Sequence, residues 1–254
     1  MSFARYPSLL DRVVFITGGG SGIGAAMVEA FVGQSSSVAF VDVDREASLA
    51  LVERLAAGPQ KPLFLECDLT NLAALETAME EVRQRLGPFA ALINNAANDA
   101  RQDADEITEA DWDAAMAVNL KHQFFAAQIA RRSMRERGGG SIVNLSSGAW
   151  MIGWPRMAAY STAKAAVVGM TNALAREFGP DNIRVNAIAP GLVLTARQRR
   201  LWFADPDDVA KAIGRQCLAI ALQAEDVARV ALFLAADDSR AITKQCLIVD
   251  AGTR

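Results

Sequence analysis

The chain alternates short apolar runs rich in Val and Ile with longer segments of helical period, and this alternation restricts the folds that it can adopt. Seven apolar runs are strand candidates, at 12–16, 37–42, 62–66, 90–94, 141–146, 183–189 and 246–250. Helix-length segments separate them, for example at 22–34, 45–58, 72–87 and 158–179. The strand candidates are apolar on both faces, and parallel strands need crossover connections. The pattern therefore predicts a doubly wound α/β fold, with a seven-stranded parallel sheet and helices on both faces.

The length and the connections predict one domain over residues 1–254. A chain of 254 residues with 52% hydrophobic and 22% charged residues can bury one large core. The connection at about 190–217 is long for this fold class and lies between the last two strand candidates. Long connections of this kind are often binding loops or lids, so we expect this segment to cover a substrate site.

Charge and cysteine content argue against several kinds of partner. Lys and Arg total 26 against 29 Asp and Glu, a formal net charge of -3, so nothing favours nucleic acid or an anionic membrane. No apolar run has the length of a signal peptide or approaches the ~20 residues of a membrane span. We therefore expect a cytoplasmic protein with a small-molecule substrate. Cys67, Cys217 and Cys246 form no Cys-x-x-Cys pair, so neither a disulfide framework nor a metal site is expected.

A glycine cluster follows the first strand candidate and runs directly into a helical segment. Gly18, Gly22 and Gly24 permit a tight turn and close approach of a pyrophosphate, and the helix N-terminus offers free N–H donors. The spacing Gly-x-x-x-Gly-x-Gly differs from the Gly-x-Gly-x-x-Gly fingerprint, and the alternative is a flexible turn. Its place between the first strand and the first helix favours dinucleotide binding.

Two carboxylates follow the next strand candidates. Asp42 ends the second one, where it can accept hydrogen bonds from an adenosine ribose and repel a 2′-phosphate. NAD is therefore preferred, with NADP possible because Arg45 is close by. The alternative is that Asp42 caps the next helix. Asp68, after the third strand candidate, can cap a helix, meet the adenine edge, or do both.

Several further motifs occur in a fixed order. They are "TGGGSGIG" at 17–24, "NNAA" at 94–97, Asn119, Ser147, "YSTAK" at 160–164 and "PGLVLT" at 190–195. Each is weak alone, but the ordered set spans nearly the whole chain and resembles the short-chain dehydrogenase/reductase family. The resemblance implies a Rossmann fold, NAD(P)-dependent hydride transfer and a homotetramer.

The "YSTAK" motif carries the expected chemistry. Tyr160 and Lys164 are four residues apart on a predicted helix, so they project into one region. A nearby positive charge favours phenolate, so we expect Lys164 to lower the pKa of Tyr160 and make it a base toward an alcohol. Ser147 ends the fifth strand candidate, where its hydroxyl can bond the reacting oxygen. The resemblance assigns this role to Ser147 rather than Ser146.

The resemblance also implies further roles. Asn119 would support a water that connects Lys164 to solvent, and Lys164 would hold the nicotinamide ribose. The implied cofactor contacts are Gly18, Ser21, Gly22, Ile23, Gly24, Asp42, Asp68, Leu69, Asn95, Tyr160, Lys164, Pro190, Val193 and Thr195. The chain departs from the family pattern at Ala97 and Ala251, where glycine is common, and alanine is strained wherever a positive φ is required.

Polar and aromatic residues around the expected site indicate the substrate class. Asn98, Trp150 and Arg197, together with Ser147 and Tyr160, are the substrate candidates, and such a pocket suits a polyhydroxylated ligand. We therefore expect oxidation of an aldose, a pentose or deoxyhexose, at C1 to the aldonolactone. The alternative is another secondary alcohol, a keto acid or a 3-oxoacyl substrate.

Other readings stay open for the residues around this pocket. Arg197, Arg199 and Arg200 can also form an exposed helix face, and the tryptophans can serve packing or a subunit interface. His122 is expected to be a packing or exposed residue rather than a catalytic one.

Overall fold

The computed structural model describes residues 3–58 and 60–253, and these residues form the predicted sheet. Seven parallel strands pair in the order β3-β2-β1-β4-β5-β6-β7. Their bounds are β1 (Val13–Thr17), β2 (Ser37–Asp42), β3 (Leu63–Glu66), β4 (Phe89–Asn94), β5 (Gly140–Leu145), β6 (Ile183–Pro190) and β7 (Cys246–Val249). Each strand agrees with its predicted range to within one residue at either end. The strand prediction is confirmed, and the order is that of a doubly wound Rossmann fold.

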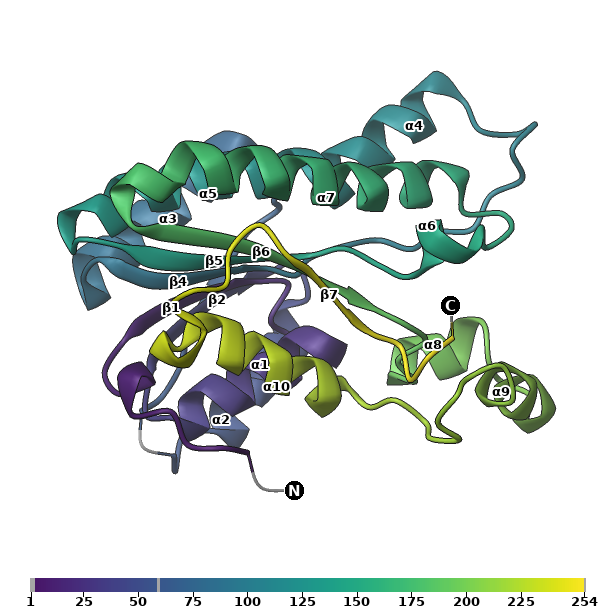
Figure 1. The fold of residues 1–254 in the computed structure, drawn as a ribbon, viewed down its shortest axis with the longest axis horizontal. Coiled ribbons are helices and arrows are strands. Elements are labelled where there is room, and N and C mark those ends of the chain that lie inside the picture. Colours follow the sequence, from purple (N-terminus) through teal and green to yellow (C-terminus); the bar gives the residue numbers. More distant parts are fainter. Residues whose placement is uncertain (1–2, 59, 254) are drawn as a thin grey trace.

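Two helical layers cover the faces of the sheet (Figure 1). One layer holds α3 (Leu72–Leu86), α5 (His122–Glu136) and α7 (Ala158–Phe178), and the other holds α1 (Gly22–Gly33), α2 (Arg45–Arg54) and α10 (Ala224–Ala235). Successive side chains of a strand point to opposite faces. Accordingly Val14 and Ile16 of β1 pack in the apolar cluster under α1 and α10, whereas Val13 and Phe15 pack in the cluster under α3 and α5.

Side-chain caps fix where the helices near the site begin. Asp44 caps α2, Asn71 caps α3, and Thr108 caps α4 (Glu109–Met116), each by accepting a backbone N–H bond. α2 ends at Arg54, four residues before the end of its predicted segment. After Leu55, the C-cap, the sequence continues with Ala-Ala-Gly-Pro. Glycine and a residue before proline both disfavour helical backbone, so the helix does not continue to residue 58.

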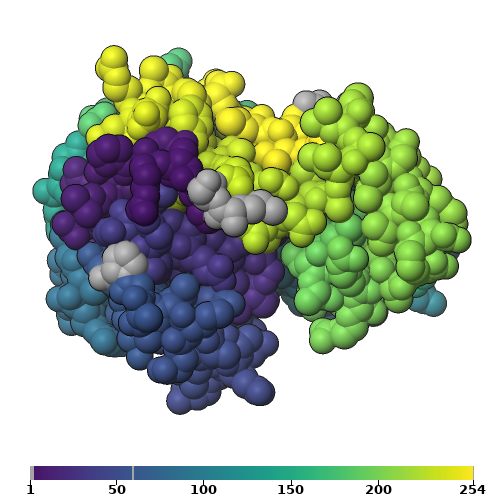
Figure 2. Space-filling model, turned by 90° about the horizontal axis from the view of Figure 1, so that it is seen from below, coloured from purple at the N-terminus to yellow at the C-terminus, as the bar shows by residue number. Residues whose placement is uncertain are grey.

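The 190–217 connection, called the lid segment below, contains two short helices. These are α8 (Ala196–Leu201) and α9 (Pro206–Ile213), and both lie beyond the carboxyl ends of the strands (Figure 1). A parallel bridge between Val193 and Leu222 ties the segment's base to the chain that leads into α10. Figure 2 shows the green residues of this segment as a lobe beside the purple and blue N-terminal residues, with a notch between them. The segment therefore stands where a cover for the sheet's carboxyl edge was predicted.

Within the described residues, the structure contains no helix that is both long and apolar enough to cross a bilayer.

Candidate active site

The glycine loop between β1 and α1 is shaped so that side chains are excluded. Gly18 and Gly22 have φ angles of +66° and +55°, which favour glycine. A β-carbon at Gly18 would lie 2.7 Å from the Cα of Ala96, and one at Gly24 would overlap the carbonyl oxygen of Gly18. The α1 helix starts at Gly22, so its free N–H groups face the space over this loop. This cradle fits the pyrophosphate of a dinucleotide.

Asp42 lies at the end of β2 beside the glycine loop. Its Oδ2 accepts a hydrogen bond from the Gly20 backbone N–H at 2.8 Å, and its Oδ1 accepts from the Asp44 N–H at 3.0 Å. The predicted alternative that Asp42 caps α2 is wrong, because Asp44 is that cap. Arg45 pairs instead with Glu66, at 3.2 Å. Asp42 is thus a carboxylate that directly contacts the glycine loop.

Ser147, Tyr160 and Lys164 meet at the carboxyl edge of the sheet. The Ser147 hydroxyl shares a hydrogen bond with the Tyr160 phenol, and Lys164 Nζ lies 5.7 Å from the centre of the Tyr160 ring. Ser146 has a different task, since its hydroxyl donates to the Lys164 carbonyl at 2.7 Å. The prediction that Tyr160 and Lys164 share one region is confirmed, and Ser147 is the serine that contacts the phenol.

The electrostatics of this group differ from the prediction. Burial raises the pKa of Tyr160 to about 12, and the charge of Asp99 adds to the rise, whereas the Ser147 bond opposes it. Burial also lowers the pKa of Lys164 to about 7, and its Nζ donates to the Leu145 carbonyl at 2.8 Å. The expected lowering of the Tyr160 pKa by Lys164 is wrong for the free protein, because burial raises this pKa and Lys164 is not among the groups that oppose the rise.

Asn119 uses its side chain to hold the loop after β4. It lies in a π-helical turn (Ala117–Lys121) between α4 and α5 and is fully buried. Its Nδ2 donates to the Asn98 carbonyl at 3.0 Å, and its Oδ1 accepts from the Asn98 N–H at 2.9 Å. π-helical turns often occur at functional sites. The implied support of a water stays a prediction, and the side chain has the additional task of fixing Asn98.

Buried polar side chains continue beneath the catalytic groups. Asn94 donates to Asn144 at 2.9 Å, and Asn144 donates to Thr171 at 3.0 Å. Gln123 donates to the Asn119 carbonyl at 3.3 Å, and its buried Oε1 has no partner within the described residues. We call the following residues the catalytic floor: Asn94, Asn119, His122, Gln123, Asn144, Ser147, Tyr160, Lys164 and Thr171.

His122 belongs to this floor. It is fully buried, and its Nε2 lies 3.2 Å from the Ala96 carbonyl. Burial and the nearby Lys164 charge lower its pKa to about 4, so the imidazole is neutral at physiological pH. The packing interpretation of His122 is therefore confirmed, and a proton-transfer role is disfavoured.

Several implied cofactor residues serve the backbone around the cleft. The Asn95 amide donates to the Thr17 and Gly18 carbonyls at 3.1 and 2.8 Å, so it joins β4 to the glycine loop. Asp68 accepts from the Thr70 N–H at 2.9 Å and does not cap α3, since Asn71 does, so its predicted capping role is wrong. Leu69 is buried in the apolar cluster under α3. Contact of Asn95, Asp68 and Leu69 with the adenosine stays a prediction, as it does for the exposed Ser21 and half-buried Ile23.

The residues after β6 come back to the glycine loop. The Pro190 carbonyl accepts from the Gly148 N–H at 2.8 Å, which joins the ends of β5 and β6. The Val193 side chain is in the core, so only its backbone is open to a ligand. Thr195 caps α8, and its Cγ2 would lie 3.3 Å from a β-carbon at Gly22. The structure thus brings Thr195 close against Gly22 of the glycine loop.

Three of the substrate candidates, Asn98, Trp150 and Arg197, form hydrogen bonds with other residues of the chain. Arg197 donates to Asn98 Oδ1 and to Asp99 Oδ1, both at 3.2 Å. Trp150 donates its indole N–H to Ser146 Oγ at 3.2 Å. Direct contact of these residues with a substrate stays a prediction.

The sequence places Asp99 and Arg101 near the expected pocket, but it gives neither residue a role of its own. Asp99 also accepts from Gln198 at 2.5 Å, and the Arg101 guanidinium lies 4.2 Å from the centre of the Trp202 ring. Arg101 Nε and Trp202 Nε1 are buried without a hydrogen-bond partner in the described residues. The available signal was the opposite charge of Asp99 in "NDAR" at 98–101 and the arginines in "RQRR" at 197–200, which could have indicated an ion pair.

Of the two departures from the family pattern, one is strained. Ala251 has a φ of +54°, whereas Ala97 is not among the described residues with positive φ. The carbonyls of Ala251 and Gly252 accept from Leu218 and Cys217, at the end of the lid segment, at 3.0 and 3.2 Å. The strain therefore lies where the C-terminus holds the lid segment.

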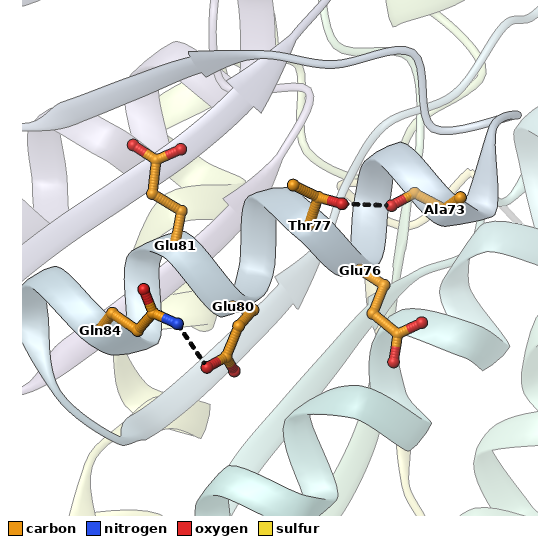
Figure 3. A pocket seen from close by; sticks show the side chains of 6 residues that line it. All are labelled: Ala73, Glu76, Thr77, Glu80, Glu81 and Gln84. Atoms are coloured by element: carbon orange, nitrogen blue, oxygen red, sulfur yellow. Dashed lines mark hydrogen bonds between the residues drawn. The ribbon is translucent and has the colours of Figure 1, made fainter.

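A groove on α3 lies outside this site. Figure 3 shows that all its side chains come from one helix: Ala73, Glu76, Thr77, Glu80, Glu81 and Gln84. Glu81 points away from Glu76 and Glu80, and these carboxylates pair with Arg85, Arg132 and Arg83. The groove is a solvated helix surface. No group of three or more His, Cys, Asp and Glu side chains within the described residues could hold a metal ion.

Comparisons with known proteins agree with this geometry. The family model described as "Enoyl-(Acyl carrier protein) reductase" matches residues 18–254. "Probable galactose dehydrogenase GalD" of Rhizobium meliloti (strain 1021) is 50% identical over 250 residues, 98% of this chain and 97% of that protein. "D-xylose 1-dehydrogenase" of Caulobacter vibrioides (strain NA1000 / CB15N) is 43% identical over 254 residues, 100% of each. The solved structure of a short-chain type dehydrogenase/reductase from Mycobacterium ulcerans matches with a TM-score of 0.91 at 27% identity, over 100% of this chain and 91% of that chain.

Proposed function

Because the chain belongs to the short-chain dehydrogenase/reductase family, we propose that it oxidises an aldose such as galactose or D-xylose at C1 to the aldonolactone, with NAD as the acceptor. The observation that carries the proposal is the meeting of Ser147, Tyr160 and Lys164 at the sheet edge that the glycine loop also borders. Ligands of open α/β sheets bind at this edge.

Each catalytic group has a task in that reaction. Tyr160 Oη takes the proton of the C1 hydroxyl, and Ser147 Oγ donates a hydrogen bond to the oxygen as it becomes a carbonyl. A bound oxidised nicotinamide would supply the hydride acceptor for C1 and a positive charge in the site. The phenol is protonated in the free protein, and its pKa of about 12 must fall for it to act. Lys164 supplies part of the required positive charge, since its pKa of about 7 leaves it partly protonated near neutrality.

The preference for NAD rests on Asp42. Its carboxylate stands 2.8 Å from the Gly20 N–H in the glycine loop, where a 2′-phosphate would meet its negative charge. The position of the glycine loop, which excludes β-carbons, supports binding of the dinucleotide there. Gly18, Gly22 and Gly24 would hold its pyrophosphate.

A second candidate is reduction of an acyl carrier substrate, which the description of the matching family model favours. The lid segment bears Arg197 and Gln198, whose polar side chains suit hydroxyl groups better than an acyl chain. We therefore place the aldose first.

The test is a panel of sugars, keto acids and acyl thioesters, each with NAD, NADP and their reduced forms. We expect NADH formation with an aldose and recovery of the lactone or its sugar acid. Turnover of an acyl thioester, together with no oxidation of any sugar, would remove the proposal.

Asp42→Ala tests the choice of cofactor. We expect the NAD-over-NADP preference to fall by about tenfold or more, because the carboxylate no longer bonds the ribose or repels the phosphate. Asp44→Asn, two residues away, keeps a capping side chain and should leave the preference unchanged. Equal preferences in Asp42→Ala and wild type would refute the role.

The remaining expectations belong to the same proposal. We propose one catalytic domain over the chain, assembled as a homotetramer in the cytoplasm. Sedimentation of the purified protein checks the assembly.

A further inference from the structure

The loop after β4 joins the catalytic floor to the lid segment. Asn119 holds the backbone of Asn98 through two hydrogen bonds, of 2.9 and 3.0 Å. The next residue, Asp99, receives Arg197 and Gln198 of α8 on its two carboxylate oxygens, at 3.2 and 2.5 Å. One short loop therefore touches a buried catalytic residue on one side and the lid segment on the other.

Asp99 is the acidic member of this contact, and it is well placed to act on the tyrosine. Its side chain is only 16% exposed, whereas that of Arg197 is 50% exposed. Its negative charge also acts on Tyr160 and raises the pKa of the phenol. The same carboxylate is therefore shared between the lid segment and the catalytic base.

Few buried side chains hold the two helices of the lid segment, because Phe203 is the one buried residue between 196 and 213. Neither α8 nor α9 buries a residue completely. Where Trp202 covers Arg101, two donors, Arg101 Nε and Trp202 Nε1, are buried without partners. Buried unpaired donors favour an open arrangement in which water reaches them. The bonds to Asp99 oppose that opening.

We propose that Asp99 is a positioning residue that couples the lid segment to catalysis: Arg197 and Gln198 close on its carboxylate, and this closure offsets part of the negative charge that Asp99 exerts on Tyr160. The inference rests on the proposed dehydrogenase function. Opening the segment leaves the charge uncompensated, so the tyrosine is a poorer base until the cover is in place.

Other charged groups set the background. Lys164 on α7 lies beside the Tyr160 ring, Arg197 on α8 pairs with Asp99, and Arg101 is within reach of the charges of Asp99 and Arg156. Lys164 donates to the Leu145 carbonyl, and this bond does not involve the lid segment. Its charge is therefore present whether the segment is open or closed. Only the Arg197 contact is made by a segment that can leave.

The test compares the two partners of the ion pair in full-length enzyme. In Asp99→Asn the charge that opposes phenolate is gone, so the acidic limb of the kcat against pH profile should move to lower pH. In Arg197→Gln the Asp99 charge is uncompensated, so the same limb should move to higher pH. We expect each shift to be about half a pH unit or more. In both variants KM should rise about tenfold, because the contact that holds the lid segment against Asp99 is lost.

The opposite signs separate this proposal from a merely structural role, which would leave the limb unmoved in both variants. Asp99→Glu should restore most of the wild-type profile. The controls are Glu76→Gln and Arg132→Gln, which break an exposed ion pair between α3 and α5 and should change nothing.

A second readout needs no turnover. Trypsin should cut after Arg199 or Arg200 about threefold faster or more in Asp99→Asn and Arg197→Gln than in wild type, because proteolysis follows the open population. Unchanged cleavage with unchanged pH limbs would overturn the coupling. The kinetics use whichever substrate of the panel the wild type turns over, so a failure of the aldose assignment shows in the wild type alone.

Discussion

The catalytic floor and the lid segment border one site but are held by different kinds of interaction. In the floor, Asn119, His122 and Gln123 are completely buried, and their neighbours are backbone carbonyls and other buried amides. In the lid segment, α8 and α9 bury no residue completely, and Arg197 reaches Asp99 from a half-exposed position. Buried networks fix one geometry, whereas exposed contacts exchange readily with water. The floor is therefore held in one geometry, whereas the contacts of the lid segment are easily altered.

The largest expected effect is in the floor. Tyr160→Phe removes the base without changing the ring, so kcat should fall by roughly a thousandfold or more, with little change in KM or in the melting temperature. Steady-state kinetics and thermal unfolding check this. A residual kcat within about tenfold of wild type would contradict the proposed role and with it the contrast between the regions.

The next effect is on stability in acid. Burial lowers the His122 pKa from its ordinary value of 6.5 to about 4, so between these pH values the unfolded chain binds a proton that the folded chain does not. Stability should therefore fall as the pH drops from 6.5 to about 4, by about 3 kcal/mol.

His122→Gln removes this titration. Urea unfolding of wild type and variant across the window should show a flatter pH dependence in the variant. Parallel curves would show that the floor does not hold the imidazole neutral.

A smaller effect is expected in the lid segment. Trp202→Leu removes the aromatic ring that lies 4.2 Å from the Arg101 guanidinium. We expect KM for the sugar to rise by about tenfold while kcat changes less than about twofold, since cation–π contacts contribute about 1–2 kcal/mol. A large loss of kcat with unchanged KM would mean that this segment shares in the chemistry, which would break the comparison.

The smallest effect concerns the C-terminal contact that holds the end of the lid segment. Ala251 has a φ of +54°, and glycine adopts that backbone without strain. Ala251→Gly should stabilise the protein by about 0.5 kcal/mol, because relief of strain exceeds the entropy that glycine adds to the unfolded chain. Ser35→Gly, at a φ of +61° remote from the site, is the matched control and should show a similar gain. No gain in either variant would mean that the left-handed backbone stores no strain.

The strands and the meeting of Tyr160 and Lys164 could be predicted because they depend on local patterns, whereas the roles of Ser147 and Asn119 were implied by the family resemblance. Apolar runs of fixed length mark the strands, and the spacing of Tyr160 and Lys164 on a helix brings them together in any fold that contains it. The direction of the Tyr160 pKa could not be predicted, since it depends on how deeply the surrounding fold buries the phenol. The Asp99 to Arg197 contact was missed for a similar reason: the residues are far apart in the chain, and only the tertiary structure sets their distance.

Thr195 lies close against Gly22, yet the two residues are far apart in the chain. A ribosome that has made only the first three βα units has already produced the glycine turn, but not the segment at Thr195 that packs against it. Affinity for a nucleotide should therefore be among the last properties that a newly synthesised or refolding molecule acquires, well after most of its secondary structure.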